Sequence, residues 1–503
     1  MAYQTRVELP MELVDTLIIG AGLSGIGAAR QLQDKCPDRS FVILEGRERL
    51  GGTWDLFRYP GIRSDSDMYT MGYDSKPWRD PKAIADGPSI LAYLQEAASE
   101  RGIDRAIRFG HRVVGADWSS QDARWTVEAE LAGGERRRFG AKFLFVCSGY
   151  YSYRHGHTPD FAGREDFTGA VVHPQDWPRD LDFAGKRVVV IGSGATAMTL
   201  VPAMAKTAAR VTMLQRSPTY VVSWPAEDAL ANWLKRLLPA GLAYRITRWK
   251  NVLFQRYVFR KAQAEPAKVR AELLALIRKE LGPDFDIGKH FSPSYMPWEQ
   301  RLCLVPDSDL FKAIRSGKAD VVTDQIERFT AKGIKLQSGA ELPADVIVTA
   351  TGLDLVLLGE VAYSIDGKAV DFADSWSYRG MMFSGVPNLI YVLGYVNASW
   401  TLRSELVAEF ACRLFNHMRA RGAAVCTPRL RESDRQMQRR PLIDGFTPNY
   451  LLRVLGKFPR QGDRAPWQNR QNYLEDRDEF RKATLEDGVL DFAPEPRPAQ
   501  KVA

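Results

Sequence analysis

The sequence predicts an α/β fold with two Rossmann-like dinucleotide-binding domains and a helical insertion. Two glycine-rich turns, at residues 20–25 and 192–197, each follow a short β-branched run and precede a helical apolar pattern. The chain length of 503 residues supports the same prediction, because it is enough for two to four domains with buried cores.

Composition narrows the class of protein. Hydrophobic residues make up 45% and charged residues 26%, which is typical of a soluble globular protein and excludes a disordered or fibrous chain. The net charge of +8 does not by itself indicate nucleic-acid binding. The five cysteines form no CxxC pair, which favours a reducing compartment and argues against a structural metal site. The N-terminal segment has no apolar core of signal-peptide length, so we expect a cytoplasmic protein.

The first part of the chain alternates strand and helix patterns. Residues 15–45 are typical of a strand, a glycine turn, a helix and a second strand. A helix is predicted from Ser89, a suitable N-cap, to Gly102, a suitable stop. Residues 106–147 contain three strand-like segments separated by polar turns, which predicts a β-meander.

The strand–turn–helix pattern returns at 187–205, and the strand-like segment VTMLQR follows it. Residues 226–282 are predicted to be helical, and residues 345–352 to form a further strand. The proline-rich end of the chain is predicted to be disordered.

The first glycine turn, Gly20-x-Gly22-x-x-Gly25, has the spacing of a dinucleotide-binding fingerprint. Its three glycines permit a tight turn, the approach of a pyrophosphate and close helix–strand packing, respectively. The helix N-terminus adds N–H donors for the phosphates. Glu45 ends the next strand, where an acid accepts hydrogen bonds from ribose hydroxyls. These features predict a dinucleotide site, and an ordinary glycine turn is the alternative.

The second turn, Gly192-x-Gly194-x-x-Ala197, repeats the fingerprint without the acid. Its following strand leads into Arg216 and Ser217, which would bind a 2′-phosphate that a carboxylate would repel. This predicts NADP at the second site, unless Arg216 is merely a solvated charge at a strand end. Two dinucleotide sites in one chain suggest electron transfer, with FAD at the first site and a nicotinamide donor at the second.

Further motifs resemble the type I Baeyer–Villiger monooxygenases, a branch of the class B flavoprotein monooxygenases. The segment Phe167-x-Gly169-x-x-x-His173-x-x-x-Trp177-Pro178 matches their fingerprint and lies between the two glycine turns. Gly52-x-Trp54-x-x-x-x-Tyr59-Pro60-Gly61-x-x-x-Asp65 matches a second signature, and residues 349–352 match the domain-linking segment. Within this family the sequence is most similar to the ethionamide-activating (EthA-type) group, in segments such as GYVNASWTL and VTMLQRSPTY.

The resemblance implies an enzyme that uses FAD, NADPH and O2. It would convert ketones to esters or lactones through a C4a-peroxyflavin, and would also oxidise sulfides or thioamides. Gly52, Trp54 and Asp65 would contact the flavin, and His173 would support domain motion rather than the chemical step.

The resemblance also identifies a catalytic pair. Arg301 matches the family's active-site arginine, a cation that stays protonated and stabilises an oxyanion. Asp65 matches the acid that pairs with it, and Asp67 is the alternative. Gln300 stands where many members place a lysine, so NADPH selectivity would depend mainly on Arg216 and Ser217.

The resemblance divides the chain into six segments. The FAD-binding domain would take residues 1–150 and 353–490, the NADP-binding domain 151–225 and 301–352, the helical insertion 226–300 and a disordered tail 491–503.

The helical insertion carries an unusual charge distribution. Residues 229–264 contain eight Lys and Arg side chains, no Asp or Glu, and six aromatic side chains. One interpretation is a packed helix pair with a solvated basic face, and the other is peripheral contact with a membrane surface. Nucleic-acid binding is disfavoured because no nucleic-acid module is recognisable.

Three functions remain open at this point. The leading one is a Baeyer–Villiger monooxygenase acting on small ketones or sulfur compounds. The second is a flavin N- or S-oxygenase without ketone activity, which Trp177 and Arg301 disfavour. The third is a flavoprotein redox sensor without turnover.

Overall fold

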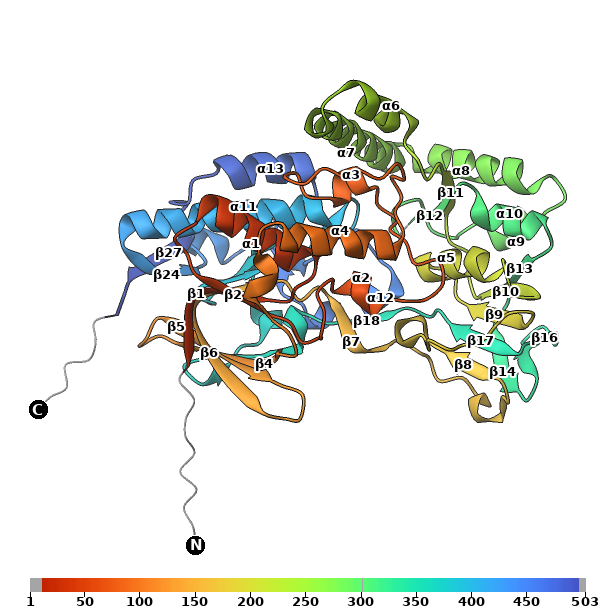
Figure 1. The fold of residues 1–503 in the computed structure, drawn as a ribbon, viewed down its shortest axis with the longest axis horizontal. Helices are drawn as coiled ribbons and strands as arrows, with labels where there is room; N and C mark the ends of the chain where they lie inside the picture. Colours follow the sequence, from red (N-terminus) through yellow and green to blue (C-terminus); the bar gives the residue numbers. More distant parts are fainter. Residues whose placement is uncertain (1–10, 301, 497–503) are drawn as a thin grey trace, which may run out of the picture.

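The computed structural model describes residues 11–300 and 302–496; Arg301 and both chain ends lie outside these ranges. Two sheet-centred units lie side by side, and a group of helices runs along one edge of both (Figure 1). This arrangement is the α/β fold with two Rossmann-like units that the two glycine turns predict.

The first unit is built on a nine-stranded sheet in the order β20-β19-β4-β5-β6-β1-β2-β3, with β23 also paired to β6. Strand β1 is parallel to β2 and β6, whereas β4, β5 and β6 form the predicted antiparallel meander. The strands are β1 (Glu12–Ile19), β2 (Phe41–Leu44), β3 (Ile107–Arg108), β4 (Arg112–Ser119), β5 (Arg124–Glu130), β6 (Arg136–Val146), β19 (Ala362–Ile365), β20 (Lys368–Ala369) and β23 (Leu389–Tyr391).

Helices α1 (Leu23–Lys35), α4 (Gly87–Ser99) and α11 (Trp400–Arg421) cover one face of this sheet (Figure 1). Ile18 and Ile43 of the sheet and Ile26 of α1 are fully buried in the core between these layers. Because α11 comes from the last quarter of the chain, the first unit is assembled from both ends of the sequence.

The second unit has a five-stranded, fully parallel sheet in the order β13-β10-β9-β17-β8. Its strands are β8 (Ala170–Val172), β9 (Arg187–Ile191), β10 (Arg210–Gln215), β13 (Ala319–Thr323) and β17 (Val346–Thr349). Helices α5 (Ala195–Met204) and α10 (Asp309–Arg315) pack against each other on this unit. Val188 and Val190 are buried, as expected for a parallel sheet covered by helices.

The predicted helical segment forms α6 (Ala229–Leu237), α7 (Ala240–Ala264), α8 (Pro266–Leu281) and α9 (Ile287–His290). Helix α7 packs against α3 (Met68–Met71) of the first unit, and α8 packs against β11 (Val221–Trp224) of the second. The remaining elements are short: α2 (Thr53–Leu56), β7 (Tyr151–Gly156), β12 (Cys303–Pro306), β14 (Ile326–Thr330), β15 (Gly333–Leu336), β16 (Glu341–Pro343), β18 (Leu353–Leu355), β21 (Ser377–Tyr378), β22 (Met382–Phe383), β24 (Ala423–Pro428), β25 (Arg440–Pro441), α12 (Asn449–Leu452), β26 (Arg460–Gln461), α13 (Tyr473–Lys482) and β27 (Leu490–Pro494).

Two local predictions are wrong. Helix α4 begins at Gly87, because Asp86 rather than Ser89 caps it by accepting a hydrogen bond from the Ser89 N–H. The tail predicted to be disordered from residue 491 instead begins as strand β27, which pairs antiparallel with β24. Phe492 packs against the core of the first unit, which outweighs the nearby prolines; residues 497–503 lie outside the described part.

Among the described residues, no helix combines the length and the apolar composition that crossing a bilayer requires.

Candidate functional site

The first glycine turn connects β1 to α1 in the geometry that the fingerprint requires. Gly20 has φ +102°, and a Cβ there would lie 2.8 Å from the Cys147 carbonyl oxygen. A Cβ on Gly25 would overlap the Gly20 carbonyl oxygen, so helix and strand need this glycine for close packing. Gly22 is the N-cap of α1 and no side chain caps the helix, so its first N–H groups remain available to an anion.

Glu45 lies directly after β2 and holds the turn in place. Its Oε2 accepts a hydrogen bond from the Ala21 N–H at 2.8 Å, and its Oε1 accepts one from the Arg47 N–H at 3.0 Å. Burial raises the pKa of the Glu45 carboxyl group, and these hydrogen bonds oppose that rise. Each carboxylate oxygen keeps a second lone pair with which it could accept a ribose hydroxyl.

The segment with Gly52 and Trp54 lies against the first turn. A Cβ on Gly52 would come within 3.1 Å of the Gly22 Cα, so the two glycine backbones lie in close contact at the wall of the site. Asp55 holds the segment in place through ion pairs. Its buried carboxylate pairs with three arginine side chains: Arg47 at 2.5 Å, Arg58 at 3.0 Å and Arg49 at 3.2 Å. Sequence reasoning missed this cluster, although an acid flanked by three arginines within a few residues was a usable signal.

The second glycine turn reproduces the first. Gly192 has φ +131°, and a Cβ there would overlap the Ala350 carbonyl oxygen, just as Gly20 faces Cys147. Gly194 is the N-cap of α5, again without a side-chain cap, and open space surrounds the position of its missing Cβ. Ala197 is fully buried.

Arg216 and Ser217 follow β10 and are both exposed beside this turn. The Ser193 hydroxyl donates to the Ser217 carbonyl oxygen at 2.9 Å, which ties the strand end to the glycine turn. In the described part of the chain no ion pair involves Arg216, so its guanidinium is available to a phosphate.

One cavity of about 290 Å³ joins the two units. Its lining includes Gly22, Gly52, Trp54 and Asp65 from the first unit and Thr196 from the start of α5. Both uncapped helix N-termini therefore border the same space. Trp400 closes another side, where its ring stacks on Tyr150 and its indole N–H donates to the Ser24 hydroxyl at 2.9 Å.

The segment 59–65 brings Asp65 to this cavity by packing on the second unit. A Cβ on Gly61 would lie 3.0 Å from the Thr199 carbonyl oxygen of α5, so glycine is needed for the approach. Arg63 forms an ion pair with Asp309 of α10 at 2.5 Å. Sequence reasoning missed this bridge, and no local pattern marks it because the partners are 246 residues apart.

The structure describes only one member of the predicted catalytic pair. Asp65 lines the cavity, whereas Arg301 lies outside the described residues, so their pairing stays a prediction. Asp67, the alternative acid, caps α3 and accepts hydrogen bonds from Asn251 at 2.8 Å and Gln255 at 2.9 Å. These bonds fix Asp67 as a link to α7 and favour Asp65 for the catalytic role.

His173 lies at the connection between the units, the other fingerprint residues lie in the second unit, and none of the four is in the lining of this cavity. His173 Nδ1 accepts from the Gln175 N–H at 3.1 Å, so Nε2 carries the proton and donates to the Gly352 carbonyl oxygen at 3.1 Å. Burial lowers the pKa of His173, which favours this neutral form. Phe167 and Trp177 pack in the second unit, and a Cβ on Gly169 would overlap the Asp345 carbonyl oxygen. This geometry suits a structural link at the domain junction.

Among the described residues, no cluster of three or more His, Cys, Asp or Glu side chains could hold a metal ion.

Comparison with known proteins identifies the family. A family model described as flavin-binding monooxygenase-like matches residues 16–252. The chain is 54% identical to the FAD-containing monooxygenase EthA of Mycobacterium tuberculosis over 97% of this chain and 99% of that protein. It is 48% identical to the probable FAD-binding monooxygenase AlmA of Acinetobacter baylyi, over 95% of this chain and 96% of that protein.

Solved structures share the fold. An oxidized steroid monooxygenase bound to NADP superimposes with a TM-score of 0.75 at 24% identity, covering 96% of this chain and all of that one. A complex of OTEMO with FAD and NADP gives a TM-score of 0.76 at 19% identity, with the same coverage. Identity to the curated relatives over nearly the whole length is far above what a shared fold alone would give. The chain belongs to the flavin-binding monooxygenase-like family.

Proposed function

We propose that the protein is an NADPH-dependent flavin monooxygenase that converts ketones to esters or lactones and also oxidises sulfides or thioamides. The observation that carries the proposal is the single cavity bordered by both uncapped glycine-turn helices and by Asp65. Two nucleotides whose pyrophosphates lie on α1 and α5 would meet in this cavity.

The site residues fit FAD at the first turn and NADPH at the second. Bound FAD would supply electron transfer from NADPH and the activation of O2. Gly22 and Gly52 line the cavity without side chains, so a pyrophosphate could approach their backbone, and Glu45 could accept a ribose hydroxyl. Arg216 and Ser217 would bind the 2′-phosphate that distinguishes NADPH from NADH.

The oxygenation step depends on a cation and on exclusion of water. Arg301 would stabilise negative charge on oxygen, because a guanidinium stays protonated and offers several donors. The Asp65 carboxylate would hold that guanidinium in place. The rings of Trp54 and Trp400 would keep water away and so strengthen these charge interactions.

Product analysis with linear, cyclic and aryl ketones, beside a sulfide and a thioamide, tests the proposal. Ester or lactone formation supports it. Sulfoxide formation without any ester would favour the S-oxygenase alternative. A yellow protein whose NADPH consumption no substrate stimulates would favour the redox sensor.

Arg301→Ala should abolish ester formation while NADPH still reduces the flavin. Hydride transfer creates no oxyanion, whereas attack on a carbonyl does, and loss of one such charge contact costs about 3 kcal/mol or more, roughly a hundredfold in rate. Stopped-flow reduction and product analysis measure the two steps separately. Near-normal ester yield would remove Arg301 from the mechanism.

Arg216→Ala should raise the KM for NADPH roughly ten- to a hundredfold and leave the KM for NADH nearly unchanged, because the arginine binds only the 2′-phosphate. Steady-state kinetics with both coenzymes measure this. Arg210→Ala is a matched control, since Arg210 lies at the opposite end of the same strand and pairs with Asp320. Equal loss with both coenzymes would make Arg216 a structural residue.

We also propose that helices α6 and α7 contact an anionic membrane surface. They expose a run of large apolar side chains, here called the apolar stripe: Leu230, Trp233, Leu237, Leu242, Ile246, Trp249, Leu253, Phe254 and Tyr257. Exposed Arg236 and Arg245 lie on the same helices. Apolar surface of this extent, beside exposed cations, matches an interfacial helix.

Part of the basic charge in this segment is not free for lipid. Arg248 is buried, pairs with Glu405 at 2.7 Å and donates to the Gly72 carbonyl oxygen at 2.7 Å. Lys250 pairs with Asp228. These two cations therefore belong to the packed-helix interpretation, and a test of membrane contact must avoid them.

Vesicle sedimentation tests the membrane proposal. The protein should sediment with anionic vesicles and dissociate as salt rises. The double variant Ile246→Ser, Leu253→Ser should bind vesicles more weakly, because it buries less apolar surface in the membrane. The double variant Arg236→Gln, Arg245→Gln should show vesicle binding that depends less on salt. Absence of binding to anionic vesicles would leave only the packed-helix interpretation.

A further inference from the structure

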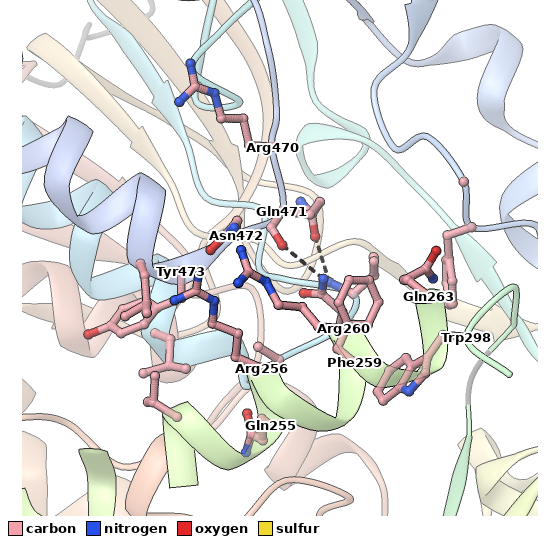
Figure 2. A pocket seen from close by; sticks show the side chains of 18 of the residues that line it. Gln255, Arg256, Phe259, Arg260, Gln263, Trp298, Arg470, Gln471, Asn472 and Tyr473 are labelled. Atoms are coloured by element: carbon pink, nitrogen blue, oxygen red, sulfur yellow. Dashed lines mark hydrogen bonds between the residues drawn. The ribbon is translucent and has the colours of Figure 1, made fainter. Parts of the chain in front are cut away.

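A second cavity, of about 320 Å³, lies between α7 and loops of the first unit (Figure 2). We call it the arginine cavity, because Arg256, Arg260 and Arg470 line it. Its volume is within the range of small-molecule sites. Residues 396–398, 444–446 and 470–474, the last of which run into the start of α13, form its other wall.

The cations of this cavity are only partly neutralised. Arg470 pairs with Glu479 at 3.3 Å, and Asp444 is the single acidic side chain in the lining. In the described part of the chain, neither Arg256 nor Arg260 has an ion pair, and the buried Nε of Arg256 has no hydrogen-bond partner. The two arginines are one turn apart on α7 and repel each other. An anion between them would relieve that repulsion.

Figure 2 shows both guanidinium groups directed from α7 toward residues 471–473. That facing segment is held firmly, since Gln471 accepts a hydrogen bond from the Val396 N–H and its carbonyl oxygen accepts one from Asn397, both at 2.9 Å. Charged groups on one wall and a fixed polar segment on the other form a site for a charged headgroup.

Part of the lining is apolar and aromatic. Phe259 meets Trp298 edge to face at 5.5 Å between ring centroids, and Val252 and Leu402, which also line the cavity, belong to one buried cluster. Trp298 has φ +73°, a backbone conformation that costs energy in a non-glycine residue and is concentrated at functional sites. The wall therefore suits an alkyl or aryl chain.

The arginine cavity adjoins the cavity shared by the two glycine turns. Ala398 lines both of them, and Tyr395 and Trp400 on either side of it line the shared cavity. A molecule with its headgroup at Arg256 and Arg260 could therefore extend its apolar end toward the shared cavity.

We propose that the arginine cavity binds the carboxylate of an amphipathic substrate whose apolar chain carries the oxidisable ketone or sulfur. This proposal rests on the proposed monooxygenase function and names its substrate class. Arg256 and Arg260 are specificity residues for the headgroup and take no part in the oxygenation.

Direct binding tests the site without turnover. By isothermal titration calorimetry, FAD-loaded wild type should bind decanoate more tightly than 1-decanol. The double variant Arg256→Gln, Arg260→Gln should bind decanoate roughly ten- to a hundredfold more weakly and leave 1-decanol unchanged. Lys261→Gln, on the same helix but outside the lining, is the matched control, and Arg256→Lys with Arg260→Lys should retain most of the preference. Equal affinity for decanoate and 1-decanol, or no effect of the double variant, would overturn the proposal.

Two further measurements distinguish a substrate site from a coenzyme site. Saturating NADP⁺ should not displace decanoate; displacement would assign the arginines to the coenzyme and overturn the proposal. In turnover, the double variant should raise the KM for 9-oxodecanoate and leave the KM for 2-decanone unchanged. If neither ketone is converted, the proposed Baeyer–Villiger function fails, while the decanoate titration still decides the arginine cavity.

Discussion

Gly22→Val should purify colourless. Gly22 has φ −81°, which any residue adopts, and a Cβ there would lie 3.5 Å from the Gly52 Cα, an ordinary contact. The backbone at this position therefore tolerates a Cβ atom. The valine would instead occupy space beside the turn that a pyrophosphate needs, and overlap of this kind costs about 3 kcal/mol or more, over a hundredfold in Kd. The flavin absorbance of the purified variant measures the loss.

Gly25→Val is the contrasting control. Its Cβ would overlap the Gly20 carbonyl oxygen, so this variant should lose the fold as well as FAD. Gly22→Val should keep the circular dichroism spectrum of the wild-type apoprotein, although loss of bound FAD will lower its thermal midpoint. Stoichiometric FAD in Gly22→Val would refute the assignment of FAD to the first turn.

Gly194→Val should purify yellow but resist reduction by NADPH. Gly194 holds the equivalent place at the second turn, with φ −81° and open space around the missing Cβ. The same substitution should therefore spare the fold and the flavin and block only the second pyrophosphate, again at a cost of about 3 kcal/mol. The rate of anaerobic flavin reduction under stopped flow measures this.

Dithionite provides the control for Gly194→Val, because it should reduce the bound flavin of the variant as fast as that of wild type. Together the two valine variants separate the sites: one loses the flavin, and the other keeps it without its electron donor. If NADPH reduces Gly194→Val normally, the second turn is not the coenzyme site.

Local patterns predicted the glycine turns well because their geometry depends on nearby residues. Gly20 and Gly192 both have the positive φ that the tight turn requires, and the strands that lead into them end in buried residues. Pattern reasoning failed where a distant contact decides the outcome. Arg248 resembles a surface charge in the sequence, yet it is buried against Glu405, 157 residues away.

The position of Asp65 beside α5 also depends on distant contacts, namely Gly61 against Thr199 and Arg63 with Asp309. The family resemblance indicated that Asp65 belongs to the active site, but nothing in the local sequence indicates what holds it there. The arginine cavity escaped prediction for the same reason, since its walls come from five separate parts of the chain.

Helix α7 carries two unlike surfaces that adjoin each other. Leu253 of the apolar stripe and Arg256 of the arginine cavity are three residues apart, a rise of about 4.5 Å along the helix. If the stripe rests on a bilayer, an amphiphile dissolved in the lipid would reach the cavity by a lateral route that avoids the aqueous phase. The concentration of the amphiphile per unit of membrane area would then set the rate of its oxidation. Apparent KM values would scale with the amount of lipid in the assay.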